Sequence, residues 1–343
     1  MPRTWLIRSP DSRTELPEVR VSASVQMKAV VQHSFGAPAV LTLREAARPI
    51  PLPTEVLVRV RAAGVNPVDW QTRAGAGMSW ALGEPPFILG WDVSGVVEEV
   101  GFGVTTLAPG DEVYGMPWFP RAAGGYAEFV TAPSRQFARK PRSLSHEQAA
   151  AVPLAALTAW QTLVDTAHVQ PGQRVLVHAA GGGVGHFAVQ IAKHLGAYVI
   201  GTASSARHNW LNGLGADQLI DHTTVAFEDL LADIDVVLDL VGDNRGNTSI
   251  RSLNVLRPGG LIIAVPGGVS PELAAAADAA GMRATPFLVE PDGTALTTIA
   301  ELIDAGAIRV EVEEVFPLAK AGRAHARGES LHTRGKLVLR VAS

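Results

Sequence analysis

The 343-residue chain contains no cysteine. A chain without thiols forms no disulfide, holds no thiolate zinc site and has no cysteine nucleophile. Disulfides are rare in the cytoplasm, so the absence fits a cytoplasmic protein, and we expect that location.

Excess charge of one sign and long apolar runs are also missing. The formal net charge is −4, and no run of Lys or Arg stands out, which disfavours electrostatic binding of nucleic acid. No stretch is long and apolar enough for a membrane-spanning helix, so we expect no membrane partner. With 47% hydrophobic residues over this length, two packed domains are expected.

Residues 1–26 differ from the rest of the chain. They carry four Arg and three Pro and lack an apolar core of signal-peptide length. We expect a flexible extension here, with an upstream start codon as the alternative. A strand-like run follows from Met27.

The segment 27–152 consists of short β-like runs that Gly and Pro interrupt. The clearest runs lie at 56–60, 92–100, 109–113 and 124–130. Frequent turns between short strands predict a compact, barrel-like β domain. From Gly293 the sequence again resembles the first segment, with a helix expected over 296–305 and strands over 310–312 and 336–341. We therefore expect 27–152 and 293–343 to form one discontinuous domain.

The middle of the chain alternates strands and helices. After helical stretches at 145–151 and 155–167, continuously apolar strands are expected at 174–178, 198–202, 218–221, 235–241 and 261–265. Segments of crossover length separate them, which is typical of a doubly wound parallel sheet. The fold class is therefore α/β, with a doubly wound parallel sheet over 153–292 beside the β-rich domain.

A glycine cluster follows the first strand of this sheet and opens a helix. The sequence from His178 to Gly185 reads HAAGGGVG, and the apolar residues after it fall on one helical face. A strand, glycines and a helix in this order predict a dinucleotide site, with the pyrophosphate on the backbone. The binding residues would be Ala180, Gly181, Gly182, Gly183, Val184 and Gly185. Ala180 replaces the usual first glycine, and a merely tight turn is the alternative.

The end of the second strand indicates which dinucleotide binds. NAD sites place an acid there for the ribose 2′-hydroxyl, but this strand is followed by Ser204, Ser205 and Arg207. Hydroxyls and a guanidinium suit a 2′-phosphate, so we predict NADPH as the cofactor. In the alternative, the serines only cap the next helix.

The chain resembles the medium-chain dehydrogenase/reductase superfamily, in its zinc-free quinone oxidoreductase (zeta-crystallin-like) branch. The matching segments follow one order along nearly the whole chain: 64–69, 90–97, 109–113, 125–128, 157–160, 179–185, 214–217, 257–260 and 335–339. The resemblance implies a GroES-like catalytic domain, a Rossmann domain, a cleft between them and a homodimer. Where zinc-dependent members carry Cys and His, this chain has Asn66 and Trp91, so no metal is expected.

The resemblance also implies site residues. Asn66 and Thr158 would lie beside the nicotinamide, although Asn66 could simply form a turn and the Thr158 hydroxyl could bond its own helix. His222 matches a position near the adenine and 2′-phosphate, and Lys336 is a candidate phosphate ligand. Because strand ends line the ligand crevice of an open sheet, we expect further contacts from Val241, Gly242, Val265, Pro266, Gly267, Phe287 and Val289.

These observations predict an NADPH-dependent reductase that transfers hydride to a quinone or an α,β-unsaturated carbonyl compound without zinc. One alternative is an alkenal or enoyl double-bond reductase of secondary metabolism. Enoyl-thioester reductases of the superfamily use a tyrosine whose place falls near Gly77, and the three tyrosines lie elsewhere, at 114, 126 and 198. The other alternative is an NADPH-binding structural protein with little turnover.

Overall fold

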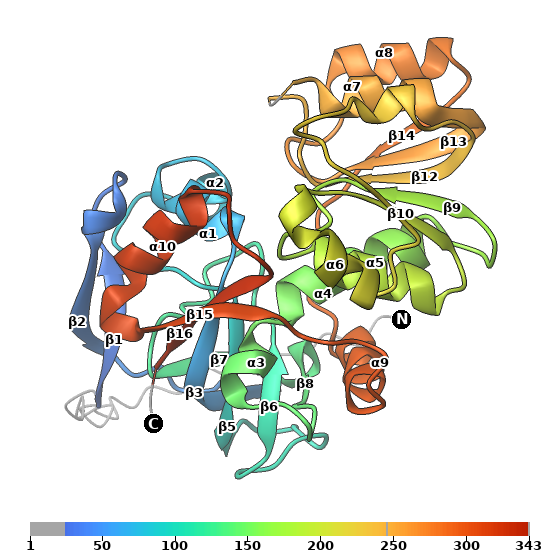
Figure 1. The fold of residues 1–343 in the computed structure, drawn as a ribbon. Coiled ribbons are helices and arrows are strands. Elements are labelled where there is room, and N and C mark those ends of the chain that lie inside the picture. The colour runs from blue at the N-terminus through green and yellow to red at the C-terminus, as the bar shows by residue number, and fades with distance from the viewer. Residues whose placement is uncertain (1–24, 245, 342–343) are drawn as a thin grey trace, which may run out of the picture.

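Six parallel strands form the first of two large sheets, in the order β11-β10-β9-β12-β13-β14. The computed structural model describes residues 25–244 and 246–341 (Figure 1). The six strands are β9 (Arg174–Val177), β10 (Tyr198–Thr202), β11 (Gln218–Ile220), β12 (Ile234–Asp239), β13 (Leu256–Ala264) and β14 (Arg283–Pro286). Between them run α5 (Gly185–His194), α6 (His208–Gly213), α7 (Thr248–Ser252) and α8 (Pro271–Ala279). The prediction of a doubly wound parallel sheet is confirmed.

The second unit is β-rich. Its larger sheet has the order β15-β16-β3-β5-β6-β8, with β7 also pairing with β3, and its smaller sheet has the order β2-β1-β4. The strands are β1 (Gln26–Gln32), β2 (Leu41–Ala47), β3 (Glu55–Val65), β4 (Phe87–Ile88), β5 (Asp92–Val100), β6 (Glu112–Gly115), β7 (Phe129–Pro133), β8 (Phe137–Arg139), β15 (Val312–Pro317) and β16 (Lys336–Arg340). The helices are α1 (Pro67–Arg73), α2 (Ser79–Leu82), α3 (His146–Ala150) and α10 (Ala321–Glu329).

The last strand of the chain lies against one of the first. β16 pairs antiparallel with β3, and Leu337 stands opposite Val65. This register brings Lys336 beside Asn66, which follows β3 directly. In Figure 1 the red end of the chain crosses the blue strands of the β-rich unit.

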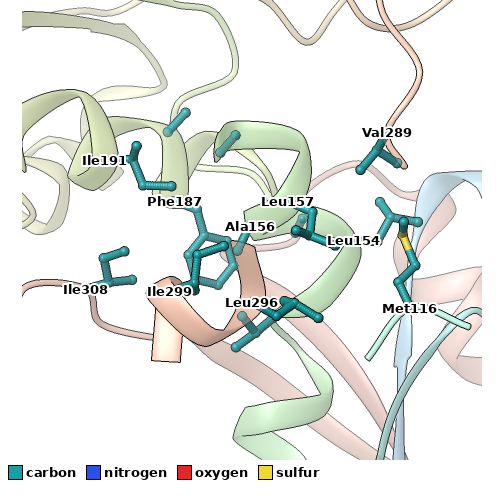
Figure 2. Packing of buried hydrophobic residues seen from close by; sticks show 14 of the residues in the cluster. Met116, Leu154, Ala156, Leu157, Phe187, Ile191, Val289, Leu296, Ile299 and Ile308 are labelled. Atoms are coloured by element: carbon teal, nitrogen blue, oxygen red, sulfur yellow. The ribbon is translucent and has the colours of Figure 1, made fainter. Parts of the chain in front are cut away.

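Two helices connect the units. α4 (Pro153–Trp160) continues into a π-helical segment, Gln161–Thr166, and α9 (Gly293–Asp304) packs against α4 and β8. Leu154, Leu157, Phe187, Leu296 and Ile299 from α4, α5 and α9 share one buried cluster (Figure 2). Burying a side chain of this size stabilises a fold by roughly 1.5–3 kcal/mol. This cluster therefore packs the helices of the Rossmann unit against the helices that connect it to the β-rich unit.

Some predicted elements differ from the structure at their ends. The expected strand at 124–130 begins only at Phe129. The residues before it make an isolated bridge instead of a continuous ladder: Ala127 pairs with Ala29, and the Glu128 amide donates to the Lys28 carbonyl oxygen at 3.0 Å. The expected strand at 310–312 runs from Val312 to Pro317. The predicted extension 1–26 falls mostly on residues 1–24, which lie outside the described residues, whereas Gln26 already belongs to β1.

Within residues 25–244 and 246–341, no helix has the length and apolarity needed to cross a membrane.

Candidate active site

In the loop between β9 and α5, glycine leaves one side of the backbone without a covering side chain. A Cβ atom on Gly182 would meet only the Ala179 carbonyl oxygen, at 3.3 Å, so this side of the glycine is open. A Cβ on Gly185 would lie 2.3 Å from that same oxygen, so only glycine lets α5 start this close to the loop. The amides of His186 and Phe187 donate to the Gly182 and Val184 carbonyl oxygens, and the positive end of the α5 dipole points to this loop and favours an anion. The loop therefore fits a dinucleotide pyrophosphate.

Ala180, the departure from the usual first glycine, is accommodated by a glycine on the next strand. Its side chain has no exposed surface, and a Cβ on Gly201 of β10 would lie 2.8 Å from its methyl carbon. Its amide donates to the Thr202 carbonyl oxygen at 3.0 Å. Alanine in place of the usual glycine at position 180 thus preserves the close approach of β9 and β10, because Gly201 leaves room for its methyl group.

Arg207 lies across the glycine loop. Its Nη1 donates to the Gly181 carbonyl oxygen at 2.9 Å, and its Nη2 donates to the His332 carbonyl oxygen at 2.8 Å. The predicted 2′-phosphate ligand is therefore close to the loop and already bonded to two carbonyl groups. Ser204 is half-buried and Ser205 is exposed, and neither side chain caps the short 3-10 turn Ser205–Arg207.

An acid that the sequence analysis missed stands beside these serines. Asp221 follows β11, and its Oδ2 accepts a hydrogen bond from the Ser205 amide at 3.0 Å. Hydrogen bonds from Thr223, and then from Ser205, lower the pKa of this carboxyl, so it is ionised. NAD sites place their acid at the end of the second strand, whereas Asp221 lies at the end of the neighbouring one. A carboxylate at this place repels a 2′-phosphate and would reduce the affinity for NADPH relative to NADH. Titration with both nucleotides measures this preference. The exposed His222 follows it directly.

Asn66 is buried, and its backbone amide and both ends of its side-chain amide make hydrogen bonds. Its backbone amide donates to Asp69 Oδ2 at 2.7 Å, and its Nδ2 donates to Asp92 Oδ2 at 2.8 Å. Its Oδ1 accepts a hydrogen bond from Lys336 Nζ. Turn formation, the alternative for Asn66, is also observed, because Asn66 is the N-cap residue of α1.

Lys336 and two carboxylates make this region a buried charge cluster. Lys336 Nζ lies 3.6 Å from Asp92 Oδ2 and donates to the Val65 carbonyl oxygen at 3.1 Å. Burial lowers the pKa of Lys336 and raises that of Asp92, while their mutual attraction opposes both shifts. Burial also raises the pKa of Asp69 to about 7. The ammonium points to Asn66 in this structure, so the predicted contact of Lys336 with a phosphate stays a prediction.

Thr158 is buried inside α4. Its Oγ1 donates to the Leu154 carbonyl oxygen of the same helix at 2.7 Å, which is the arrangement that the alternative described. The hydroxyl proton is thus used within the helix, and a nicotinamide contact from Thr158 stays a prediction.

The predicted strand-end residues gather at the carboxyl edge of the Rossmann sheet. Asp239, the last residue of β12, accepts hydrogen bonds at Oδ1 from the amides of Val241 and Gly242, at 2.8 and 3.1 Å. A Cβ on Gly242 would lie 3.0 Å from the Pro266 carbonyl oxygen, so this turn touches the next one.

The other predicted residues of this edge follow β13 and β14. Val265 donates its amide to the Asp239 carbonyl oxygen at 3.1 Å, and Gly267 takes a positive φ of 78°. Phe287 follows β14 and donates its amide to the Ala264 carbonyl oxygen at 3.3 Å. The side chain of Val289 is buried in the main core cluster, so it packs beneath this edge of the sheet.

The two positions that carry zinc ligands in metal-dependent relatives are engaged differently here. Asn66 bonds to Lys336 and Asp92, as described above. Trp91 is buried edge-on against Phe119, with ring centroids 5.4 Å apart, and its Nε1 donates to the Arg121 carbonyl oxygen at 2.7 Å. In the described part of the chain, no group of three or more His, Asp or Glu side chains is placed to hold a metal ion.

Comparisons with known proteins agree with this architecture. Residues 52–142 match the model of the alcohol dehydrogenase GroES-like domain, and residues 214–339 match that of the zinc-binding dehydrogenases. NAD(P)H oxidoreductase RTN4IP1, mitochondrial, from Danio rerio is 33% identical, over 99% of this chain and 98% of its own length. The chain belongs to the medium-chain dehydrogenase/reductase superfamily, in its quinone oxidoreductase-like branch.

Two further members of the superfamily are similar over most of the chain. The NADPH-dependent alkenal/one oxidoreductase, chloroplastic, of Arabidopsis thaliana is 33% identical, over 96% of this chain and 84% of its own length. The solved structure of the quinone oxidoreductase from Coxiella burnetii superimposes with a TM-score of 0.88 at 37% identity, covering 93% of this chain and all of that one. The prediction of the superfamily and of its branch is confirmed.

Proposed function

We propose that this protein is an NADPH-dependent reductase that transfers hydride to a quinone or an α,β-unsaturated carbonyl compound. The observation that carries the proposal is the open backbone at Gly182, next to Gly181, whose carbonyl oxygen accepts from the guanidinium of Arg207. A bare glycine loop at a helix start suits a pyrophosphate, and a nearby guanidinium suits a 2′-phosphate. The names of the quinone, alkenal and NAD(P)H oxidoreductase relatives support the same reaction class.

The chain contributes binding and orientation to this reaction. When bound, NADPH supplies a hydride, and the product anion then takes a proton from water. The loop from Ala180 to Gly185 would hold the pyrophosphate, and the turns after β12 and β13 would flank the nicotinamide. Asn66 would offer an amide to the ring or to the acceptor. Because hydride addition to a quinone or enone gives a delocalised anion, the reaction needs less polarisation than reduction of a simple ketone.

The absence of zinc, the homodimer and the cytoplasmic location belong to this proposal. The side chains of Asn66 and Trp91 support a zinc-free site, since neither is a good zinc ligand and both make other hydrogen bonds. Elemental analysis of purified protein tests this point, and one zinc per chain would contradict it. Sedimentation tests the dimer, and fractionation of the source cells tests the location.

The acceptor is tested by steady-state turnover. NADPH oxidation is measured with 1,4-benzoquinone, 9,10-phenanthrenequinone and trans-2-hexenal, and we expect turnover with at least one quinone. Turnover with the alkenal alone favours the second candidate, a reductase of alkenal or enoyl double bonds, which the Arabidopsis relative supports. Tight NADPH binding without turnover would instead indicate the structural role.

A further inference from the structure

A buried lysine and a buried carboxylate contact opposite ends of one amide. Lys336, 3% exposed, donates Nζ to Asn66 Oδ1, and Asp92, with no exposed surface, accepts from Asn66 Nδ2 at 2.8 Å. An ammonium only donates hydrogen bonds and a carboxylate only accepts them. The two neighbours therefore determine which end of the amide is oxygen. Rotating the amide by 180° would turn its N–H groups toward the ammonium and its oxygen toward the carboxylate.

The backbone of Asn66 is fixed as well. Its amide donates to Asp69 Oδ2 at 2.7 Å, and its carbonyl oxygen accepts from the Asp69 amide at 2.9 Å. Among the contacts of the described residues, the second N–H of Nδ2 is the donor of Asn66 that is left for a ligand. The Nδ2 group of Asn66 is therefore a hydrogen-bond donor whose direction is fixed.

The two flanking residues are themselves held in place. Asp92 Oδ1 accepts from the Leu154 amide, at the start of α4, at 2.7 Å. The methylene chain of Lys336 lies along the glycine loop, since a Cβ on Gly183 would be 3.1 Å from Lys336 Cδ. The amide is thus oriented by side chains from β5 and β16 that also contact α4 and the Rossmann loop.

We infer that Lys336 and Asp92 are positioning residues, which hold the Asn66 amide as a donor to the carbonyl oxygen of the acceptor. This inference rests on the proposed reductase function. Negative charge develops on that oxygen as hydride reaches the acceptor. A donor that is oriented beforehand stabilises this charge without reorganisation, and removing one such donor typically lowers kcat by about 100-fold. Lys336 and Asp92 act on the rate through Asn66 alone.

A double-mutant cycle tests this dependence. Wild type, Lys336→Met, Asn66→Ala and the double variant are compared with the acceptor that wild type reduces fastest. Each single change is expected to lower kcat by about 100-fold, to leave the Kd for NADPH within about threefold, and to add nothing to the other change. Multiplied effects in the double variant would overturn the inference. So would a raised Kd for NADPH with unchanged kcat, which would make Lys336 a phosphate ligand.

A second variant keeps the inference testable if Lys336→Met does not fold. Lys336→Met leaves Asp92 buried without its partner, which strongly destabilises a protein, whereas removal of both charges is tolerated better. Lys336→Met combined with Asp92→Asn removes both charges that orient the amide, since an asparagine both donates and accepts hydrogen bonds. This variant is expected to show the same loss of kcat, absent again in the Asn66→Ala background. Wild-type kcat in this charge-free variant would overturn the inference.

The control is Lys193→Met, which removes a surface ion pair with Asp217 of 2.6 Å and should behave as wild type. If wild type itself reduces no acceptor, the proposed function fails, and this inference falls with it. If wild type turns over and the variants do too, only the positioning role fails.

Discussion

Arg207 lies across Gly181, and its Nη1 donates to the Gly181 carbonyl oxygen at 2.9 Å. The same guanidinium donates to the His332 carbonyl oxygen at 2.8 Å, in the segment that leads into β16. One side chain therefore joins the glycine loop of the Rossmann unit to the end of the β-rich unit. It is also the cation nearest in sequence to the serines that would receive a 2′-phosphate.

Replacing Arg207 by Ala should weaken NADPH more than NADH. A charge-assisted hydrogen bond contributes about 1.5–3 kcal/mol, so the Kd for NADPH should rise roughly 10- to 100-fold, while that for NADH changes less than about threefold. Calorimetric titration of both nucleotides measures this. Arg257→Ala is the matched control, because Arg257 lies near the amino end of β13, at the opposite edge of the sheet. Equal losses for the two nucleotides would remove Arg207 from the 2′-phosphate site.

Two neighbouring glycines should respond differently to alanine. Gly182→Ala places its methyl group in open space, apart from one oxygen at 3.3 Å, so the fold should be unaffected while the pyrophosphate loses its approach. Gly185→Ala places its methyl group 2.3 Å from the Ala179 carbonyl oxygen, so it should destabilise the protein by about 1–3 kcal/mol. Thermal unfolding and NADPH titration of both variants separate these effects. Normal NADPH affinity in Gly182→Ala would place the pyrophosphate elsewhere.

A largely buried ion pair ties the two ends of the β-rich unit together. Arg73 of α1, 3% exposed, donates to Glu329 of α10 at 2.5 Å and to the Gly36 carbonyl oxygen at 2.9 Å. Glu329→Gln should cost roughly 1–3 kcal/mol, because the buried guanidinium loses its counter-charge while Glu329 itself is partly exposed. Urea unfolding measures the change. The surface variant Glu301→Gln, on the exposed side of α9, should leave stability unchanged, and an equal loss there would argue against a specific pair effect.

Stability should fall on acidification below about pH 6.5. Burial lowers the pKa of His178 and His186 to about 4 and that of His325 to about 3. Between these values and the unfolded value of 6.5, the unfolded chain binds protons that the native protein does not, so the free energy of unfolding decreases as pH falls. Asp69 and Asp92 act in the opposite direction, because burial raises the pKa of Asp69 to about 7 and also raises that of Asp92, so their contributions are lost as pH rises. We expect the three histidines together to outweigh these two carboxyls between pH 7 and 5. Urea unfolding at pH 7, 6 and 5 should show a progressive loss, and constant stability would contradict these assignments.

The parts of the fold that were predictable are those with local signals. Continuously apolar strands followed by crossover segments indicated the parallel sheet, and the glycines after Val177 marked the loop between β9 and α5. The strand ends were less certain, since they depend on partners from distant segments: Ala127 makes only an isolated bridge with Ala29, and continuous pairing begins at Phe129.

The buried cluster around Asn66 could not be predicted in the same way. Lys336 and Asn66 are separated by 270 positions, and their contact depends on the pairing of β16 with β3. Asp92 gave one local signal, a carboxylate at the start of a strand, but its partners come from distant segments. Asp221 was missed because the acid beside Ser205 follows the neighbouring strand, and periodicity carries no information on which strand ends meet.

The central claim is that the loop after His178 binds a reduced nicotinamide dinucleotide. Isothermal titration of the purified full chain with NADPH tests it most directly. We expect one site per chain, with a Kd in the range of about 1–100 μM, and weaker binding of NADH. Heat of dilution alone with both nucleotides would contradict the claim and leave only the architecture.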